Sequence, residues 1–187
     1  MSMMQSVMRR LVTLTVKSQL NPRVPVTTQR KRLDLLRFTP MPGGIKESHT
    51  ELAAIPTRRL TPTPCYGAIL YLHGGAYCTG SPDSHREMVG RIARTTEREA
   101  FILDYRLAPE APYPAALDDA LAAYTDLLSR HQDIVIMGDS AGGGLAMALA
   151  EAISKTDYAQ PNAMVLMSPW CDLTCSGPTI ESNRRID

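Results

Sequence analysis

Four short apolar runs, separated by segments with helical periodicity, constrain the fold of this chain more than any other feature. Each run is bounded by turn-forming residues and consists mainly of aliphatic side chains, which is typical of strands buried on both faces. Strands that alternate with helices in this way favour right-handed crossovers and a parallel sheet covered by helices on both sides. The predicted fold class is therefore α/β. The runs are residues 68–72, 100–103, 134–137 and 163–167.

The segments between these runs predict three helices. The first opens at Ser84, where Glu87 three residues later completes the spacing of a capping box. The second begins near Pro114, has one apolar face and turns Asp119 to solvent. The third covers residues 145–153 and is apolar on most sides, as expected for a helix packed within the protein.

The first 64 residues differ from the rest in composition. Residues 21–64 are rich in Pro, Thr and Arg, so we expect only one or two short strands there, such as 32–38. Before them, the apolar spacing near residues 4–14 predicts a short amphipathic helix. Residues 1–60 hold 11 Lys or Arg against 3 Asp or Glu, although the whole chain has a formal net charge of +1. Such a basic segment could bind an anionic partner, but docking on the acidic remainder of its own chain is favoured. The expected divisions are a cap-like and leading-strand segment at 1–64, a core at 65–175 and a polar tail at 176–187.

Composition indicates a globular protein of the cell interior. Of 187 residues, 44% are hydrophobic and 21% charged, which allows one domain with a buried core. The four cysteines are too few and too irregularly spaced for a disulfide framework or a structural zinc site. No segment has the length of a membrane span or the pattern of a secretory signal. We expect a cytoplasmic protein without a structural metal, which binds neither nucleic acid nor, stably, a membrane.

The chemistry is carried by the sequence Gly138-Asp139-Ser140-Ala141-Gly142. It matches the G-x-S-x-G nucleophile elbow, in which a sharp turn between a strand and a helix lifts the serine hydroxyl above the sheet. Glycines fit there because neighbouring backbone comes too close for a side chain. The alternative, a phosphate-binding loop, would need a Walker lysine or G-x-G-x-x-G spacing, and neither is present. Ser140 is the predicted nucleophile, and the Ala141 N–H at the helix start is expected to face the oxyanion.

A second glycine-containing sequence, His73-Gly74-Gly75-Ala76-Tyr77, directly follows the first apolar run. An elbow of this kind needs backbone N–H donors from the loop after such a strand, where they stabilise the negative charge of a tetrahedral intermediate. Paired glycines leave two N–H groups free for this purpose. A glycine turn that merely reverses the chain is the alternative. Next to a nucleophile elbow, the pattern favours an oxyanion hole.

Five blocks, taken in order, resemble those of the hormone-sensitive-lipase-like esterases and lipases of the α/β-hydrolase superfamily. The likeness covers residues 67–174 and implies the α/β-hydrolase fold, with Ser140 as nucleophile and no metal or organic cofactor. By this resemblance the N–H groups of Gly74, Gly75 and Ala141 form the oxyanion hole. The motif residues expected to support them are His73, Gly138, Asp139 and Gly142. The blocks are residues 73–77, 104–110, 113–116, 138–143 and 168–170.

The order of catalytic groups departs from the family pattern. In this fold an acid and then a histidine follow the nucleophile along the chain. The 47 residues after Ser140 contain no histidine, so we expect a copy truncated at its C-terminus, without its last strands and helices. Of the four histidines, which all precede Ser140, only His85 could approach the site, although an exposed place at a helix start is favoured for it. Asp172 could serve as the acid, with a role in a turn favoured.

The predicted activity is hydrolysis of small or medium carboxylic esters through an acyl-enzyme at Ser140. The alternative is a catalytically inactive fragment, or a binding module that keeps the ester pocket. The run at 163–167 has no charge or proline to discourage pairing as an edge strand, so we also expect self-association through it.

Overall fold

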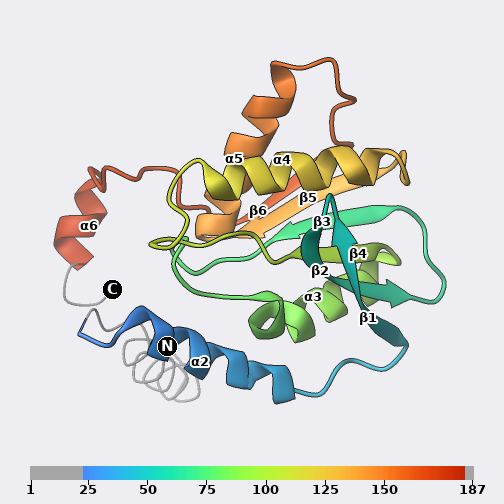
Figure 1. Ribbon diagram of the computed structural model, residues 1–187, viewed down its shortest axis with the longest axis horizontal. Helices are drawn as coiled ribbons and strands as arrows, with labels where there is room; N and C mark the ends of the chain where they lie inside the picture. The colour runs from blue at the N-terminus through green and yellow to red at the C-terminus, as the bar shows by residue number, and fades with distance from the viewer. Residues whose placement is uncertain (1–22, 184–187) are drawn as a thin grey trace.

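The computed structural model describes residues 23–183, which form one six-stranded sheet flanked by helices (Figure 1). The strands are β1 Ile45–Leu52, β2 Ile55–Pro62, β3 Ala68–Leu72, β4 Glu99–Leu103, β5 Ile134–Asp139 and β6 Ala163–Met167. Their order across the sheet is β1-β2-β4-β3-β5-β6. Strands β3 to β6 pair in parallel, whereas the β1–β2 hairpin is antiparallel and joins β4 in antiparallel orientation. The predicted α/β class with a mostly parallel sheet is confirmed.

Helices cover both faces of this sheet. They are α2 Val26–Leu33, α3 Pro82–Thr96, α4 Ala115–Leu128, α5 Ala141–Ser154 and α6 Pro178–Asn183, with a short 3-10 helix, η1 Asp34–Phe38. Helices α4 and α5 lie on one side of the sheet and α3 on the other (Figure 1). Leu70 and Leu72 of β3 pack with α4 and α5, while Ile69 and Tyr71 pack with α3. Because successive strand side chains alternate between two covered faces, the whole of β3 is buried. None of the helices within residues 23–183 is long and apolar enough to cross a membrane.

The leading segment differs from its prediction. The strand expected at 32–38 is wrong, because this stretch is the end of α2 followed by η1. Leu33, Leu35 and Leu36 do not alternate with polar residues, and Leu, Arg and Lys are good helix formers. The leading strands are instead β1 and β2. The helix expected near residues 4–14 lies outside the described residues.

The start of α3 is also corrected. Its N-cap is Ser81, whose Oγ accepts the Ser84 N–H at 3.3 Å, while the Ser84 Oγ accepts the Ser81 N–H at 2.9 Å. The helix therefore begins three residues earlier than predicted, with Pro82 in the first position, where its missing N–H costs nothing. The capping box expected between Ser84 and Glu87 is wrong, and Glu87 pairs with Arg91 one turn further on.

Asp119 on α4 is buried, contrary to its predicted place on the solvent side. Its carboxylate accepts the Arg106 backbone N–H at 2.8 Å and the Arg106 guanidinium at 2.7 Å. The loop after β4 lies against the helix at this point, and a buried carboxylate needs such partners. The helical pattern contained no sign of this contact, because the contact depends on the loop.

Strand β6 is the edge of the sheet next to β5. Its first three residues are exposed, with Met164 at 40% and Val165 at 41%, whereas β3 and β4 are buried throughout. Within the described chain, β6 thus presents apolar side chains and one unpaired backbone edge.

Candidate active site

The turn from β5 into α5 is tightly packed against neighbouring backbone. Ser140 has φ 51° and ψ −119°, a strained conformation for a residue with a side chain. A Cβ on Gly142 would lie 2.0 Å from the Leu72 carbonyl oxygen, and one on Gly138 would lie 2.3 Å from the Gly142 carbonyl oxygen. The two glycines therefore allow a turn that larger residues would open.

Backbone hydrogen bonds hold Ser140 at the carboxyl ends of the parallel strands. Its N–H donates to the carbonyl of Met167 at the end of β6, at 2.9 Å. Its own carbonyl accepts the N–H groups of Gly144 at 3.1 Å and Trp170 at 2.8 Å. Ligand sites of open α/β sheets lie at this end of the strands.

The loop after β3 lies beside this turn and contains further strained residues. Gly75 has φ 129°, and a Cβ there would lie 2.1 Å from the Thr79 carbonyl oxygen. Ala76 and Tyr77 follow with φ 54° and 59°. The N–H groups of Cys78 and Thr79 donate to the Gly75 carbonyl at 3.0 and 2.8 Å, which closes the loop into a compact turn.

The backbone N–H groups near Ser140 divide into engaged and free ones. The Gly74 N–H donates to the Asp139 carboxylate at 2.9 Å, which counts against the part expected for Gly74 in an oxyanion hole. By contrast, the N–H groups of Gly75, Ala76 and Ala141 donate to no acceptor within residues 23–183. Ala76 was not predicted from the sequence, although its place directly after the paired glycines was the signal available for it.

Asp139 links the elbow to the neighbouring loop. Besides the Gly74 N–H, its Oδ1 accepts the Tyr71 hydroxyl at 2.9 Å and lies 3.5 Å from His85 Nε2. Burial disfavours the charged carboxylate, but the contacts from His85, Tyr71 and Gly74 outweigh it and lower the pKa of Asp139. A carboxylate is therefore the stable form at this position.

His73 is fully buried under the same loop. Its ring stacks on Tyr105 with centroids 4.3 Å apart, and the Tyr105 hydroxyl donates to the His73 carbonyl at 2.6 Å. Burial, followed by the nearby His85, lowers the pKa of His73 to about 3. The ring is thus neutral, and its Nδ1 lies 2.9 Å from the Gly74 carbonyl oxygen.

A cavity of about 550 Å³ opens next to the elbow. Two residues that line it, Gly144 and Trp170, are those whose N–H groups bond to the Ser140 carbonyl. The other walls come from the loop before α4, from α4 and α5, and from the segment after β6. Most of its lining is apolar. Its larger apolar side chains are Tyr77, Leu117, Leu145, Met147 and Leu173.

Comparison with known proteins shows the family to which this chain belongs. Residues 69–186 match the family described as alpha/beta hydrolase fold. The chain belongs to this family. The resemblance to hormone-sensitive-lipase-like esterases and lipases is also confirmed, because the matching proteins include esterases, a lipase and a solved esterase of the bacterial hormone-sensitive lipase family.

Curated relatives of this chain are named as esterases and acetyl-hydrolases. It is 40% identical over 137 residues to the putative acetyl-hydrolase LipR of Mycobacterium tuberculosis, covering 71% of this chain and 44% of that protein. It is 44% identical over 112 residues to an acetyl-hydrolase of Streptomyces hygroscopicus, covering 58% of this chain and 38% of that protein. An esterase of the bacterial hormone-sensitive lipase family superposes with a TM-score of 0.87 at 33% identity, covering 96% of this chain and 63% of that one. The chain thus spans less than half the length of these two curated relatives.

None of the histidines that the structure describes directs a ring nitrogen at Ser140. His85 is not the exposed residue that was favoured, since its side chain is 16% exposed. Its Nδ1 lies 2.8 Å from the Ser84 Oγ and its Nε2 faces Asp139, so both nitrogens have other partners. His131 lies 3.6 Å from Glu99, and His49 is exposed on β1.

Asp172 has the turn role that was favoured for it. Its carboxylate accepts the backbone N–H groups of Thr174 and Ser176, both at 2.9 Å. Hydrogen bonds from the Thr174 and Ser176 side chains and backbone lower its pKa. The carboxylate is thereby occupied by its own turn.

Proposed function

We propose that this chain is the nucleophile-bearing part of a serine carboxylic-ester hydrolase that acts on small or medium acyl esters. One observation carries the proposal: Ser140 stands on a strained turn beside the free N–H groups of Gly75, Ala76 and Ala141. A strained serine next to unengaged backbone donors is the arrangement that acyl transfer requires.

In the proposed reaction the Ser140 Oγ attacks the ester carbonyl carbon and gives up its proton to a base. The carbonyl oxygen becomes an oxyanion, which the three free N–H groups stabilise; each such donor is typically worth about 2.7–4 kcal/mol in the transition state. The carbon–oxygen bond to the alcohol then breaks, and the alcohol leaves with that proton. Water attacks the resulting acyl-enzyme and releases the acid.

The acyl group is assigned to the cavity beside Trp170. Its size falls within the usual range of about 300–1,000 Å³ for small-molecule pockets, and its apolar lining suits an alkyl chain. The names of two relatives, an acetyl-hydrolase and an ethyl acetate hydrolase, support esters with short acyl groups.

None of the described histidines is assigned as the base. Among the described histidines none offers a nitrogen to Ser140, and the curated relatives are more than twice as long as the matched part. The same observation favours the second candidate function, a catalytically inactive fragment or binding module that keeps the ester pocket.

A fluorophosphonate probe and a nitrophenyl ester assay test these candidates together. We expect a form extended to the length of its relatives to be labelled and to turn over nitrophenyl acetate, and Ser140→Ala to abolish both. Ser154→Ala, at an exposed place on α5, is the matched control and should keep full activity. Undiminished turnover by Ser140→Ala would falsify the nucleophile assignment. An extended form that binds esters without labelling or turnover would instead favour the binding module.

A further inference from the structure

His85 lies where α3 meets the candidate site, yet the proposed chemistry gives it no part. Its side chain is mostly buried, and its ring lies 5.4 Å from the ring of His73 and 6.2 Å from that of Tyr71. Its two nitrogens point to different structures. Nδ1 faces the first turn of α3, whereas Nε2 faces the Asp139 carboxylate.

The hydrogen bonds around Nδ1 determine where the ring carries a proton. Nδ1 lies 2.8 Å from the Ser84 Oγ and 3.2 Å from the Ser81 carbonyl oxygen. The Ser84 hydroxyl has one proton, and the Ser81 carbonyl oxygen lies 2.8 Å from its Oγ. Either this proton turns to Nδ1 instead, which leaves the single proton of a neutral ring on Nε2, or it stays on the carbonyl and both ring nitrogens are protonated. A neutral ring protonated on Nδ1 alone would set the Nε2 lone pair against a carboxylate oxygen. In both favourable arrangements Nε2–H therefore points to Asp139.

Asp139 connects His85 to both the loop after β3 and the nucleophile elbow. Its Oδ1 accepts the Gly74 N–H at 2.9 Å, directly before the free N–H groups of Gly75 and Ala76. Asp139 also immediately precedes Ser140 in the chain. The position of this one carboxylate thus affects the spacing between the loop after β3 and the nucleophile elbow.

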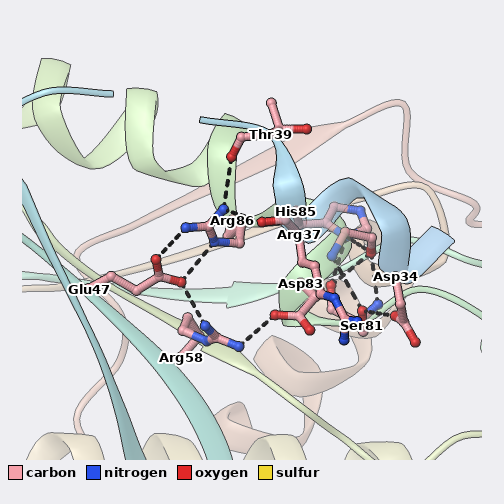
Figure 2. A network of polar contacts seen from close by, with 10 residues as sticks. Asp34, Arg37, Thr39, Glu47, Arg58, Ser81, Asp83, His85 and Arg86 are labelled. Carbon is pink, nitrogen blue, oxygen red and sulfur yellow. Dashed lines mark hydrogen bonds and ion pairs between the residues drawn. The ribbon is translucent and has the colours of Figure 1, made fainter. Parts of the chain in front are cut away.

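Side-chain contacts to other elements hold the first turn of α3, which carries His85, in place. The Ser81 Oγ donates to Asp34 of η1 at 2.7 Å, and Asp83 pairs with Arg58 of β2 at 2.6 Å (Figure 2). Figure 2 also shows Arg86 bound to Glu47 of β1, and its Nη1 donates to the Thr39 carbonyl at 2.9 Å. Contacts to three other elements thus limit movement of the helix end that carries the ring.

We propose that His85 is a positioning residue. Its Nε2–H holds the Asp139 carboxylate against the Gly74 N–H and so fixes the position of the loop after β3 relative to Ser140. The 3.5 Å separation is long for a hydrogen bond and short enough for a charge interaction. The structural coupling stands independently of the activity, whereas its effect on rate rests on the proposed function.

The coupling is tested by NMR on the 187-residue chain with two substitutions. His85→Leu removes the donor, and His85→Gln keeps an N–H donor on a side chain of comparable reach. His49→Leu is the matched control, because His49 is exposed on β1. We expect hydrogen exchange of the Gly74 amide to become about tenfold faster in His85→Leu, in keeping with the loss of about one hydrogen bond, and to stay within about twofold in the other two variants.

The carboxyl pKa of Asp139 supplies a readout that a purely structural role would not move. His85 lowers this pKa both through its N–H donor and through a coulombic contribution, so the pKa should rise in His85→Leu and rise less in His85→Gln, which keeps only the donor. The other titratable groups around Asp139 are Tyr71, His73 and Tyr105, and all three variants retain them. If His85→Leu does not fold, the comparison is made between His85→Gln and the unsubstituted chain, and a Gly74 amide exchanging tenfold faster in His85→Gln overturns the proposal.

The effect on rate is measured separately, in the extended form of the protein. There we expect His85→Leu to lower kcat about tenfold with little change in KM, since oxyanion contacts form mainly in the transition state. Unchanged Gly74 exchange and unchanged Asp139 pKa in a folded His85→Leu would overturn the proposal. An extended form without any turnover, together with the expected NMR changes, would contradict the proposed function and leave the positioning role supported.

Discussion

At the scale of single residues, neighbouring backbone excludes side chains from several glycine positions of the site. A Cβ built there would lie about 2–3 Å from backbone atoms. Gly142 is the clearest case, because an added Cβ would meet the carbonyl oxygens of Leu72 at 2.0 Å and His73 at 2.5 Å. Both oxygens belong to the backbone at the end of β3 and cannot rotate away as a flexible side chain could. Gly142 therefore sets how closely α5 approaches β3.

We predict that Gly142→Ala lowers the free energy of unfolding. Alanine favours a helix by about 1 kcal/mol over glycine, but overpacking typically costs about 1–3 kcal/mol and the contact here is with fixed backbone. Gly43→Ala is the control, since a Cβ there meets no atom within 4 Å, and it should change stability by about 0.5 kcal/mol or less. Urea unfolding of both variants measures this. Equal stabilities of the two variants would contradict the packing seen around Gly142.

His73 makes a second prediction at this scale, about stability and pH. Because burial lowers its pKa from 6.5 to about 3, the unfolded chain binds a proton between these values that the folded chain does not. The free energy of unfolding should therefore fall as pH drops from 6.5 to 5, approaching about 1.4 kcal/mol per pH unit for each such proton. His131, whose pKa is lowered first by burial, adds in the same direction.

The measurement is the slope of unfolding free energy against pH between 7 and 5, a window above the range in which Asp139 and Glu47 titrate. His73→Gln should reduce this slope by about one proton, whereas His49→Gln, at an exposed place, should leave it nearly unchanged. A slope that His73→Gln does not alter would mean that the folded and unfolded chains protonate His73 alike, which would contradict a pKa lowered by burial.

At the scale of elements, the Arg30 side chain connects α2 to the loop after β3. Arg30 donates to the Cys78 carbonyl at 2.8 Å and to the Ala108 carbonyl at 2.8 Å, and it pairs with Glu110. The Ala108 N–H in turn donates to the Tyr77 carbonyl at 2.9 Å. The Glu110 carboxylate is largely exposed, so the two carbonyl contacts matter more than the ion pair.

We predict that Arg30→Met loosens the loop between Gly75 and Thr79. Hydrogen exchange of the Thr79 amide, which donates to the Gly75 carbonyl, should become several-fold faster, because two carbonyls lose their fixed donor. Arg32→Met on the exposed side of the same helix is the control. If both variants exchange alike, α2 does not support the loop through Arg30.

At the scale of the whole molecule, the two edges of the sheet differ in kind. Edge strand β1 carries Lys46, Glu47 and Glu51, which discourage pairing with another chain. Edge strand β6 has the sequence AMVLM and no charge. An apolar strand with one unpaired edge is a template for strand addition.

We predict that the 187-residue chain self-associates through β6 and that Val165→Lys shifts it toward the monomer. Val165 is 41% exposed, so a lysine there can reach solvent while opposing edge pairing. His49→Lys on β1 is the control and should leave association as it was. Size-exclusion chromatography with light scattering distinguishes the cases, and a monomeric unsubstituted chain would refute the prediction.

The sequence by itself determined those features that depend on order along the chain. Strands β3, β4, β5 and β6 and the helices between them were predictable because a buried strand and an amphipathic helix each leave a local pattern of apolar residues. The elbow around Ser140 was predictable because its glycines, its strand and its helix are consecutive. The pattern failed at 32–38, where leucines without strict alternation formed a helix.

Only the tertiary structure decided which polar groups meet. Gly74 and Asp139 are 65 residues apart, and Arg30 and Ala108 are 78 apart, so no local period records that they bond. For the same reason the burial of Asp119 and the contact between His85 and Asp139 could not be predicted. Which N–H groups remain free for an oxyanion depends on these long-range bonds, because each bond engages a donor that the motif alone would leave available.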